Sequence, residues 1–252
     1  MTTASNLYDQ ARRDAGDGPL PTPGRALTIG AHPDDAEFGA GGTLARWAAD
    51  GCEVTMLVVT DGSKGTWDPD VDTDVLVASR VTEQRAAADV LGAADIVMLD
   101  HVDGELEYSM DLRRELCGWI RRVRPDVVLS HDPWKRYMLH PDHRATGLGA
   151  IDGVVAARDH LFFPEVGPKH RPETILLWSA DEADHAEPIE TTLQTKIEAL
   201  LCHSSQAETT MGSADRGGEA AERFAERIRT WATEQGEPFG LGPAEAFKRL
   251  AP

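Results

Sequence analysis

The sequence predicts an α/β fold in which a Rossmann-like, mostly parallel sheet carries helices on both faces, followed by a helical C-terminal extension. Two features of the chain lead to this expectation. Short runs rich in Val, Ile and Leu recur through residues 26–180, and segments with the apolar spacing of helices separate them. Such alternation with short connections is typical of consecutive βαβ units.

Five runs are expected to be buried parallel strands, because their apolar residues are consecutive instead of alternating with polar ones. They span residues 26–32, 53–62, 95–100, 126–132 and 174–180. Helices are expected between them, and the clearest lies at 111–123. Its apolar stripe consists of Leu112, Leu116, Trp119, Ile120 and Val123. The other expected helices span 38–50, 79–92 and about 141–158.

The two ends of the chain depart from this pattern. Residues 1–24 are polar and are expected to form a flexible arm. After residue 185 the spacing becomes helical, at 189–203 and at about 215–234. Too few apolar residues remain there for a second core, so residues 25–252 are expected to form a single domain.

Charge and composition limit the classes of partner. The chain has 43 acidic and 25 basic side chains, for a formal net charge of -18. Such a field repels nucleic acid and anionic membranes, so a small molecule is the expected partner. No apolar run has the length of a signal-peptide core or a membrane helix. The three cysteines are far apart and lack metal-binding spacing, which favours free thiols in the cytoplasm.

The turn His32-Pro33-Asp34-Asp35 directly follows the first expected strand. In an open α/β sheet, ligands bind beyond the carboxyl ends of the strands. The turn therefore places an imidazole and two adjacent carboxylates in the expected crevice. Adjacent carboxylates repel each other unless a cation or a proton lies between them.

A second turn, His140-Pro141-Asp142-His143, lies beyond the fourth expected strand and opens a helix. Either turn alone could be a solvated loop or a helix cap, but two such turns at strand exits favour a shared site. Together they supply the nitrogen and oxygen ligands of a catalytic zinc, which has three protein ligands and an open position. The same donor set also suits Fe²⁺.

Five segments occur in an order that resembles the LmbE-like, or PIG-L, family of zinc-dependent de-N-acetylases. They are AHPDDAEFGAGGTLA, TDGSKG, the Arg80-x-x-Glu83 pair, HPDH and His203-Ser204-Ser205-Gln206. The resemblance runs from about residue 26 to 206. It implies a hydrolase that cleaves an N-acyl, above all N-acetyl, amide on an amino-sugar-like or natural-product small molecule, and assembly into a homo-oligomer. An amidase acting on a thiol conjugate or another non-sugar amide is the alternative.

The resemblance also implies roles for individual residues. His32, Asp35 and His143 would bind zinc, Asp34 would be the general base, and His140 would stabilise the oxyanion. General chemistry agrees with these roles, because zinc lowers the pKa of bound water and a neighbouring carboxylate can take the proton. That carboxylate can then protonate the leaving amine, while a protonated His140 balances the charge of the oxyanion.

Three further residues are candidates for substrate binding. Arg80 is expected either to contact a sugar hydroxyl, as the resemblance implies, or to form a surface ion pair with Glu83. Asp103 is expected first to form a turn and second to line the pocket rim. Relatives place a tyrosine hydroxyl at the oxyanion from the loop before HPDH, which makes Tyr137 the third candidate.

Two other histidines are expected to have structural roles. His131 ends the fourth expected strand, where a packing or loop-tying function is favoured over catalysis. His203 lies near the end of an apolar helix, where a hydrogen-bonded structural histidine is the ordinary case.

A nucleotide-binding Rossmann module is the rival hypothesis from another functional class. Gly39-x-Gly41 opens a helix after the first strand, and Asp61 lies where a ribose-binding acid is expected. Leu44, however, occupies the third glycine position of that fingerprint. Asp34 and Asp35 would also repel a pyrophosphate at this helix start. The metal-dependent hydrolase is therefore the favoured function.

Overall fold

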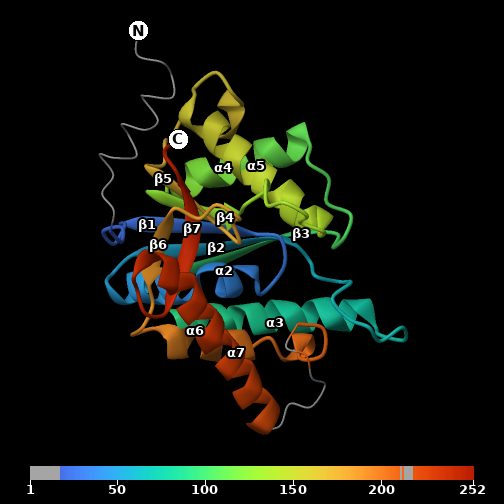
Figure 1. The fold of residues 1–252 in the computed structure, drawn as a ribbon. Coiled ribbons are helices and arrows are strands. Elements are labelled where there is room, and N and C mark those ends of the chain that lie inside the picture. Colours follow the sequence, from blue (N-terminus) through green and yellow to red (C-terminus); the bar gives the residue numbers. More distant parts are fainter. Residues whose placement is uncertain (1–17, 211, 213–217) are drawn as a thin grey trace.

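A seven-stranded mixed sheet forms the centre of the molecule in the computed structural model, which describes residues 18–210, 212 and 218–252 (Figure 1). The strand order is β3-β2-β1-β4-β5-β7-β6. The strands are β1 (Arg25–Gly30), β2 (Glu53–Thr60), β3 (Asp95–His101), β4 (Val127–His131), β5 (Thr174–Trp178), β6 (His185–Pro188) and β7 (Ala244–Leu250). β1 to β5 pair in parallel, and β7 pairs antiparallel with both β5 and β6.

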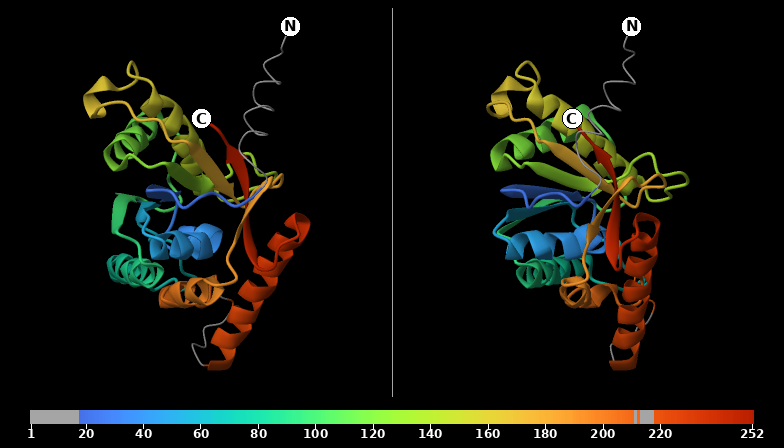
Figure 2. Two further views of the ribbon diagram at one scale, coloured as in Figure 1. Left: turned by 90° about the vertical axis from the view of Figure 1, so that its left-hand side faces the viewer. Right: turned by 60° about the vertical axis from the view of Figure 1, so that its left-hand side comes forward.

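Helices cover both faces of the sheet, as the sequence predicts. They are α2 (Asp35–Ala49), α3 (Thr73–Leu91), α4 (Met110–Val123), α5 (Pro141–Arg158), α6 (Leu193–Leu201) and α7 (Gly218–Gly236). Short 3-10 turns occupy Pro164–Val166, Ser204–Gln206 and Glu237–Phe239. α4 and α5 lie on one face, and α2, α3 and α6 lie on the other, with α7 beside α6 (Figures 1 and 2).

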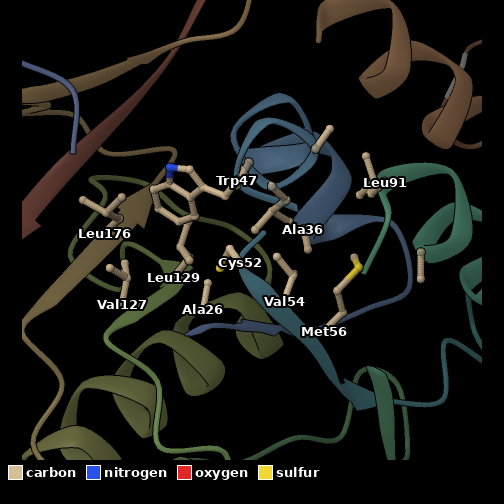
Figure 3. Close-up of a cluster of buried hydrophobic side chains, with 14 of the residues drawn as sticks. Ala26, Ala36, Trp47, Cys52, Val54, Met56, Leu91, Val127, Leu129 and Leu176 are labelled. Atoms are coloured by element: carbon tan, nitrogen blue, oxygen red, sulfur yellow. The ribbon is translucent and has the colours of Figure 1, made fainter. Parts of the chain in front are cut away.

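The buried strands divide their side chains between two cores. Val127 and Leu129 of β4 point to the core under α2, where they join Trp47 and Met56 (Figure 3). Val128, between them, points to the core under α4 and α5. Because both faces are covered by helices, the parallel strands carry apolar side chains at consecutive positions, which is the pattern that identified these strands in the sequence.

Local signals fix several helix ends. The Asp72 side chain accepts hydrogen bonds from the backbone nitrogens of Asp74 and Val75 at the start of α3. Gly92 ends this helix with a φ of 76°, a left-handed conformation that glycine adopts without strain. Pro141 opens α5, where its missing N–H is not needed.

The five parallel strands agree with the sequence prediction to within two residues at each end, but the C-terminal prediction was incomplete. The expected helical extension also contains β6 and β7, which add an antiparallel edge to the sheet. Of the expected N-terminal arm, residues 1–17 lie outside the described part. Leu20, which follows, packs against the core and its backbone nitrogen donates to Glu187 Oε1 at 2.8 Å.

No helix in the described part of the chain is long and apolar enough to span a membrane.

The strand order places the two motif turns side by side. β1 and β4 are neighbours in the sheet, with Ala26 paired to Val127 and Ile29 paired to Ser130. From β1 the chain continues to β2 and β3 on one side of the sheet, and then crosses over to β4 and β5 on the other side. Ligands of open α/β sheets bind at such a switch point. The turn after β1 and the segment after β4 therefore emerge at the same edge, about a hundred residues apart in the chain.

Candidate active site

The two motif turns meet at the carboxyl ends of β1 and β4. His32 Nδ1 lies 3.2 Å from His143 Nε2. Asp35 Oδ1 lies 3.4 Å from the same His143 nitrogen, and Asp35 Oδ2 lies 3.5 Å from His32 Nδ1. The three residues that the sequence proposed as metal ligands are thus brought together with their donor atoms facing one another.

These residues belong to one larger cluster. Within the described ranges, three groups of three side chains bring candidate ligand atoms within 4.8 Å of one another. The groups are His32 with His140 and His143, Asp35 with His131 and His143, and His32 with Asp103 and Asp142. Every group shares a histidine with another, so they describe a single centre.

The outer nitrogen of His32 is held by two buried carboxylates. His32 Nε2 lies 3.1 Å from Asp103 Oδ1 and 3.2 Å from Asp142 Oδ2. Asp142 is itself fixed by the backbone nitrogens of Gly104, at 2.6 Å, and Leu106, at 3.3 Å. With Nδ1 bound to a metal, the ring would keep its one proton on Nε2, where these carboxylates accept it. Asp103 therefore supports a site histidine in addition to forming the expected turn.

The charges around the centre do not balance. Burial lowers the pKa of His32, but hydrogen bonds with Asp103, Asp142 and Asp35 outweigh it and raise the pKa to about 12. Burial lowers the pKa of His143 to about 4, which keeps its lone pair free. Burial opposes ionisation of Asp35, yet the adjacent His143 and His131 hold its pKa well below the usual range. The centre thus has an excess of carboxylate charge that a cation would neutralise.

Asp34 differs from its neighbour Asp35 in backbone and environment. Its φ of 101° lies in the left-handed region, which is rare for a residue other than glycine and marks strain at functional sites. Burial raises the pKa of Asp34 to about 6, although Arg80 lowers it. Its backbone nitrogen donates to Gln84 Oε1 at 3.0 Å. Asp34 is therefore a carboxylate with a pKa close to neutrality, held beside the donor atoms.

Arg80 does not form the surface ion pair that was one of its two expected roles. It is buried, and its guanidinium donates to Pro33 O at 2.6 Å and Gly62 O at 3.1 Å. Its Nη2 also lies 3.7 Å from Asp34 Oδ2. Arg80 ties the HPDD turn to the loop after β2 and lines the cavity, because the helix α3 carries it beneath both loops.

Glu83 instead binds the two serines of the His203-Ser204-Ser205-Gln206 (HSSQ) motif. Its carboxylate accepts from Ser204 Oγ at 2.7 Å, Ser205 N at 2.8 Å and Ser205 Oγ at 2.6 Å. Gln206 Nε2 then donates to Gly65 O at 3.0 Å. The HSSQ motif thus anchors the loop that forms one wall of the cavity.

His140 lines the cavity beside the two ligand candidates. Its ring stacks on His143 with centroids 4.8 Å apart and meets His32 edge-on at 4.5 Å. Its Nδ1 is buried and has no hydrogen-bond partner among the described residues. Burial and the neighbouring His32 lower the pKa of His140, a direction opposite to the protonated state that the sequence analysis assumed. A neutral imidazole N–H remains a suitable donor to an oxyanion.

Tyr137 lies away from this group. Its side chain is 86% exposed, and its backbone has a φ of 62°. It borders a shallow surface depression with Arg136, Asp181 and Glu182, whereas the cavity at the centre is lined by His140 and Trp178. Of the expected substrate-binding residues, Arg80 and Asp103 line the cavity and Tyr137 does not.

Two residues of the centre escaped the sequence analysis. His131 was assigned a packing role, but its Nε2 lies 3.1 Å from Asp35 Oδ2. Asp142 was considered only as a helix cap, but it is fully buried against His32. The available signals were a histidine ending the otherwise apolar strand VVLSH and the near repetition of HPDD as HPDH.

The glycines of the rival nucleotide hypothesis serve close packing. A Cβ on Gly39 would lie 2.5 Å from the Trp178 ring, and one on Gly41 would lie 3.2 Å from Lys196 Cγ. They let α2 approach β5 and the start of α6. These contacts account for the glycine pattern without a pyrophosphate.

A cavity of about 660 Å³ opens above the centre. Histidines and aspartates line its floor, and Phe38, Trp67 and Trp231 contribute aromatic walls. Its volume falls in the range of small-molecule sites, and polar groups converge at one end of it. The arrangement suits hydrolysis of a small molecule whose reacting bond reaches the floor.

Comparison with known proteins agrees with this chemistry. A family model described as PIG-L, GlcNAc-PI de-N-acetylase, matches residues 27–154. A diacetylchitobiose deacetylase of Thermococcus kodakarensis is 35% identical over 188 residues, covering 72% of this chain and 70% of the relative. The chain belongs to the PIG-L family of de-N-acetylases.

Other proteins share its sequence or fold. A 1D-myo-inositol 2-acetamido-2-deoxy-alpha-D-glucopyranoside deacetylase of Actinosynnema mirum is 31% identical, covering 74% of this chain and 82% of the relative. The N,N'-diacetylchitobiose deacetylase structure from Pyrococcus horikoshii matches with a TM-score of 0.86 and 29% identity, covering 100% of this chain and 94% of that one. A Pseudomonas 4-carboxy-2-hydroxymuconate hydratase, with a TM-score of 0.72 and 21% identity, shows the same fold. The fold alone therefore does not select deacetylation.

Proposed function

We propose that this family member is a zinc-dependent hydrolase that removes the acetyl group from an N-acetylglucosamine glycoside. His32, Asp35 and His143 would hold the metal, Asp34 would move the proton, and His140 would bind the oxyanion. The observation that carries the proposal is the convergence of the His32, Asp35 and His143 side chains from HPDD and HPDH.

The spacing of these atoms fits zinc. Ligands about 2.0–2.1 Å from a tetrahedral ion lie roughly 3.3 Å from one another. His32 Nδ1 and His143 Nε2 are 3.2 Å apart, and the Asp35 carboxylate lies 3.4 Å from His143 Nε2 through Oδ1 and 3.5 Å from His32 Nδ1 through Oδ2. Fe²⁺ accepts the same donor set, so metal analysis has to distinguish the two ions.

The metal ion and the side chains of the protein would contribute different parts of the hydrolysis. The bound ion supplies a Lewis acid that polarises the amide carbonyl and makes water acidic near neutral pH. Asp34, ionised above its pKa of about 6, accepts the proton of the attacking water. The same carboxyl group returns the proton to the departing amine, so Asp34 ends each turnover ionised. The N–H of His140 donates to the oxygen that becomes negative.

The cavity supports a substrate larger than one sugar ring. Both relatives above are named for N-acetylglucosamine glycosides, one with a second sugar and one with inositol. The cavity of about 660 Å³ extends from the histidines to the aromatic ring of Trp67, which is 69% exposed. Exposed aromatic faces of this kind suit the apolar side of a second ring.

The three free thiols support a place of action in the cytoplasm. Cys52 and Cys117 are buried, Cys202 is half-buried, and none of the three forms a disulfide. Thiols persist in reducing compartments.

Metal analysis and a substrate screen test the proposal together. Purified protein should contain one zinc per chain and release acetate from N-acetylglucosamine glycosides, but not from N-acetylated thiol conjugates. His143→Ala should remove both metal and activity. His101→Ala is the matched control, because His101 pairs with Glu115 away from the cavity and should keep both. Full activity in protein shown to be metal-free would refute the proposal.

A further inference from the structure

The residue between the metal centre and the sheet is His131, the last residue of β4. It is buried, and its two ring nitrogens face different groups. Nδ1 lies 3.0 Å from the indole Nε1 of Trp178, and Nε2 lies 3.1 Å from Asp35 Oδ2. His131 therefore connects the end of β5 to a carboxylate at the metal centre.

Trp178 decides where the proton of His131 lies. An indole N–H can only donate, so Nδ1 of His131 must accept and has no proton of its own. In a neutral imidazole the proton then resides on Nε2, where it points at the Asp35 carboxylate. The backbone nitrogen of Ala31 lies 3.3 Å from the same Nε2. A ring that accepted from both donors would be an anion beside a carboxylate, which charge repulsion disfavours, so the Asp35 contact prevails.

This assignment excludes His131 as a metal ligand, although its position alone would allow that role. Asp35, His131 and His143 form one of the groups with candidate ligand atoms within 4.8 Å of one another. A protonated Nε2 has no lone pair to offer, and the lone pair of Nδ1 is occupied by Trp178. His131 can only act on the metal through Asp35.

Close packing against α2 and His131 fixes the position of the Trp178 ring. Its ring packs against α2 where Gly39 has no side chain, since a Cβ there would lie 2.5 Å from the ring. The ring meets the His131 imidazole edge-on, with centroids 5.0 Å apart. Trp178 is 2% exposed, so water does not compete for its N–H.

We propose that His131 is a positioning residue whose Nε2–H orients the Asp35 carboxylate for the metal, and that Trp178 imposes the required tautomer. The inference rests on the proposed metal centre. A hydrogen bond to a ligating carboxylate fixes its direction, and loss of such a contact typically weakens metal binding roughly 10–100-fold. The pair thus sets the affinity of the centre without contacting the ion.

Zinc titration of chelator-stripped protein, against a competing chromophoric chelator, tests this assignment. His131→Leu removes the donor and should weaken zinc binding by roughly 10–100-fold. His131→Gln places an amide N–H near the position of Nε2 and should restore most of the affinity. Equal affinities of His131→Leu and wild type would overturn the proposal.

The role of Trp178 is tested in two backgrounds. Trp178→Phe keeps the aromatic packing, removes the indole N–H and should weaken zinc binding in the wild-type chain. In the His131→Leu background it should have no further effect, because leucine has no nitrogen for the indole N–H to bind. Equal losses in both backgrounds would mean that Trp178 acts through packing, and the tautomer assignment would be wrong.

Trp47→Phe is the matched control for these variants. Trp47 is fully buried, and its Nε1 has no hydrogen-bond partner among the described residues. This variant should keep wild-type zinc affinity. Wild-type protein that binds no zinc would refute the proposed metal centre itself, whereas zinc binding that is insensitive to His131 would refute only this inference.

Discussion

Helix α2 passes two groups of buried charged side chains, one at its first turn and one near its middle. At the middle, Lys196 Nζ donates to Glu245 Oε1 at 2.6 Å and to Phe38 O at 2.7 Å. The Glu245 carboxylate also accepts from Gly42 N at 2.9 Å and from Thr43 N at 2.8 Å. At the first turn, around Asp34 and Asp35, acidic side chains outnumber their cationic partners.

The two groups differ in how completely their polar atoms are bonded. Both side chains of the Lys196–Glu245 pair are fully buried, and none of their charged atoms lacks a partner. Around the active site, by contrast, Glu37 Oε2, Arg80 Nε and His140 Nδ1 are buried without one among the described residues. Complete bonding makes the first group a structural element. Incomplete bonding leaves the second group able to bind something else.

The sharpest test of the comparison changes one atom of Asp34. Asp34→Asn keeps the size of the side chain and removes its basicity, so kcat should fall by roughly 10²–10⁴-fold, the usual range for a general base. Zinc content should stay close to wild type, because Asp34 is not among the three proposed ligands, and thermal stability should not fall. Near-normal turnover of this variant with metal bound would show that another group takes the proton.

A change in the Lys196–Glu245 pair should instead lower stability and leave turnover unchanged. Lys196→Met leaves the buried Glu245 carboxylate without its cation, and breaking a buried pair costs about 3–5 kcal/mol of unfolding free energy. Urea unfolding measures this loss, and kcat per folded molecule should be unchanged. Arg114→Met, which breaks an exposed pair with Asp111, is the control and should unfold like wild type. A stable but inactive Lys196→Met would place this pair in the active site.

The pH dependence of the reaction should report the environment of Asp34. Burial raises its pKa to about 6, and the base must be ionised to act. The value of kcat/KM should therefore fall about tenfold per pH unit below pH 6 and level off above it. A protein that stayed fully active down to the ordinary pKa of an aspartate would contradict this. His140→Ala should lower the plateau without moving the acid limb.

The smallest effect is expected at Tyr137. The resemblance to the family made it a candidate for the oxyanion site, but its side chain is 86% exposed and lies outside the cavity lining. Tyr137→Phe should change kcat/KM by less than about twofold, as exposed substitutions usually do. A larger loss, confined to kcat, would mean that the loop carries the tyrosine into the cavity when substrate binds.

The sequence predicted the parallel sheet and the meeting of HPDD with HPDH for a simple reason. Buried strands are apolar at consecutive positions, and adjacent parallel strands end at one edge of the sheet. β7 escaped prediction because its sequence AEAFKRL carries three charged residues. Glu245 can be buried in it only because Lys196, forty-nine residues earlier in the chain, supplies the cation.

Contacts between residues far apart in sequence also limited the prediction of the active site. The role of His131 depends on the Trp178 indole, and the exposure of Tyr137 depends on a loop conformation with positive φ. Helical spacing made an ion pair with Glu83 one of two expected roles of Arg80, yet carbonyl groups of two loops hold it instead. Motif spacing identifies which residues meet, whereas the direction of each side chain is set by contacts distant in sequence.

The left-handed backbone of Asp34 has a consequence for engineering this protein. A strained residue of this kind costs about 1–3 kcal/mol, and its buried carboxylate adds to that cost. Glycine at this position would relieve both, so an unbiased search for heat-resistant variants should recover Asp34→Gly, a folded but inactive protein. Stabilising substitutions that preserve turnover have to be sought elsewhere, for instance in the exposed faces of α3 and α4.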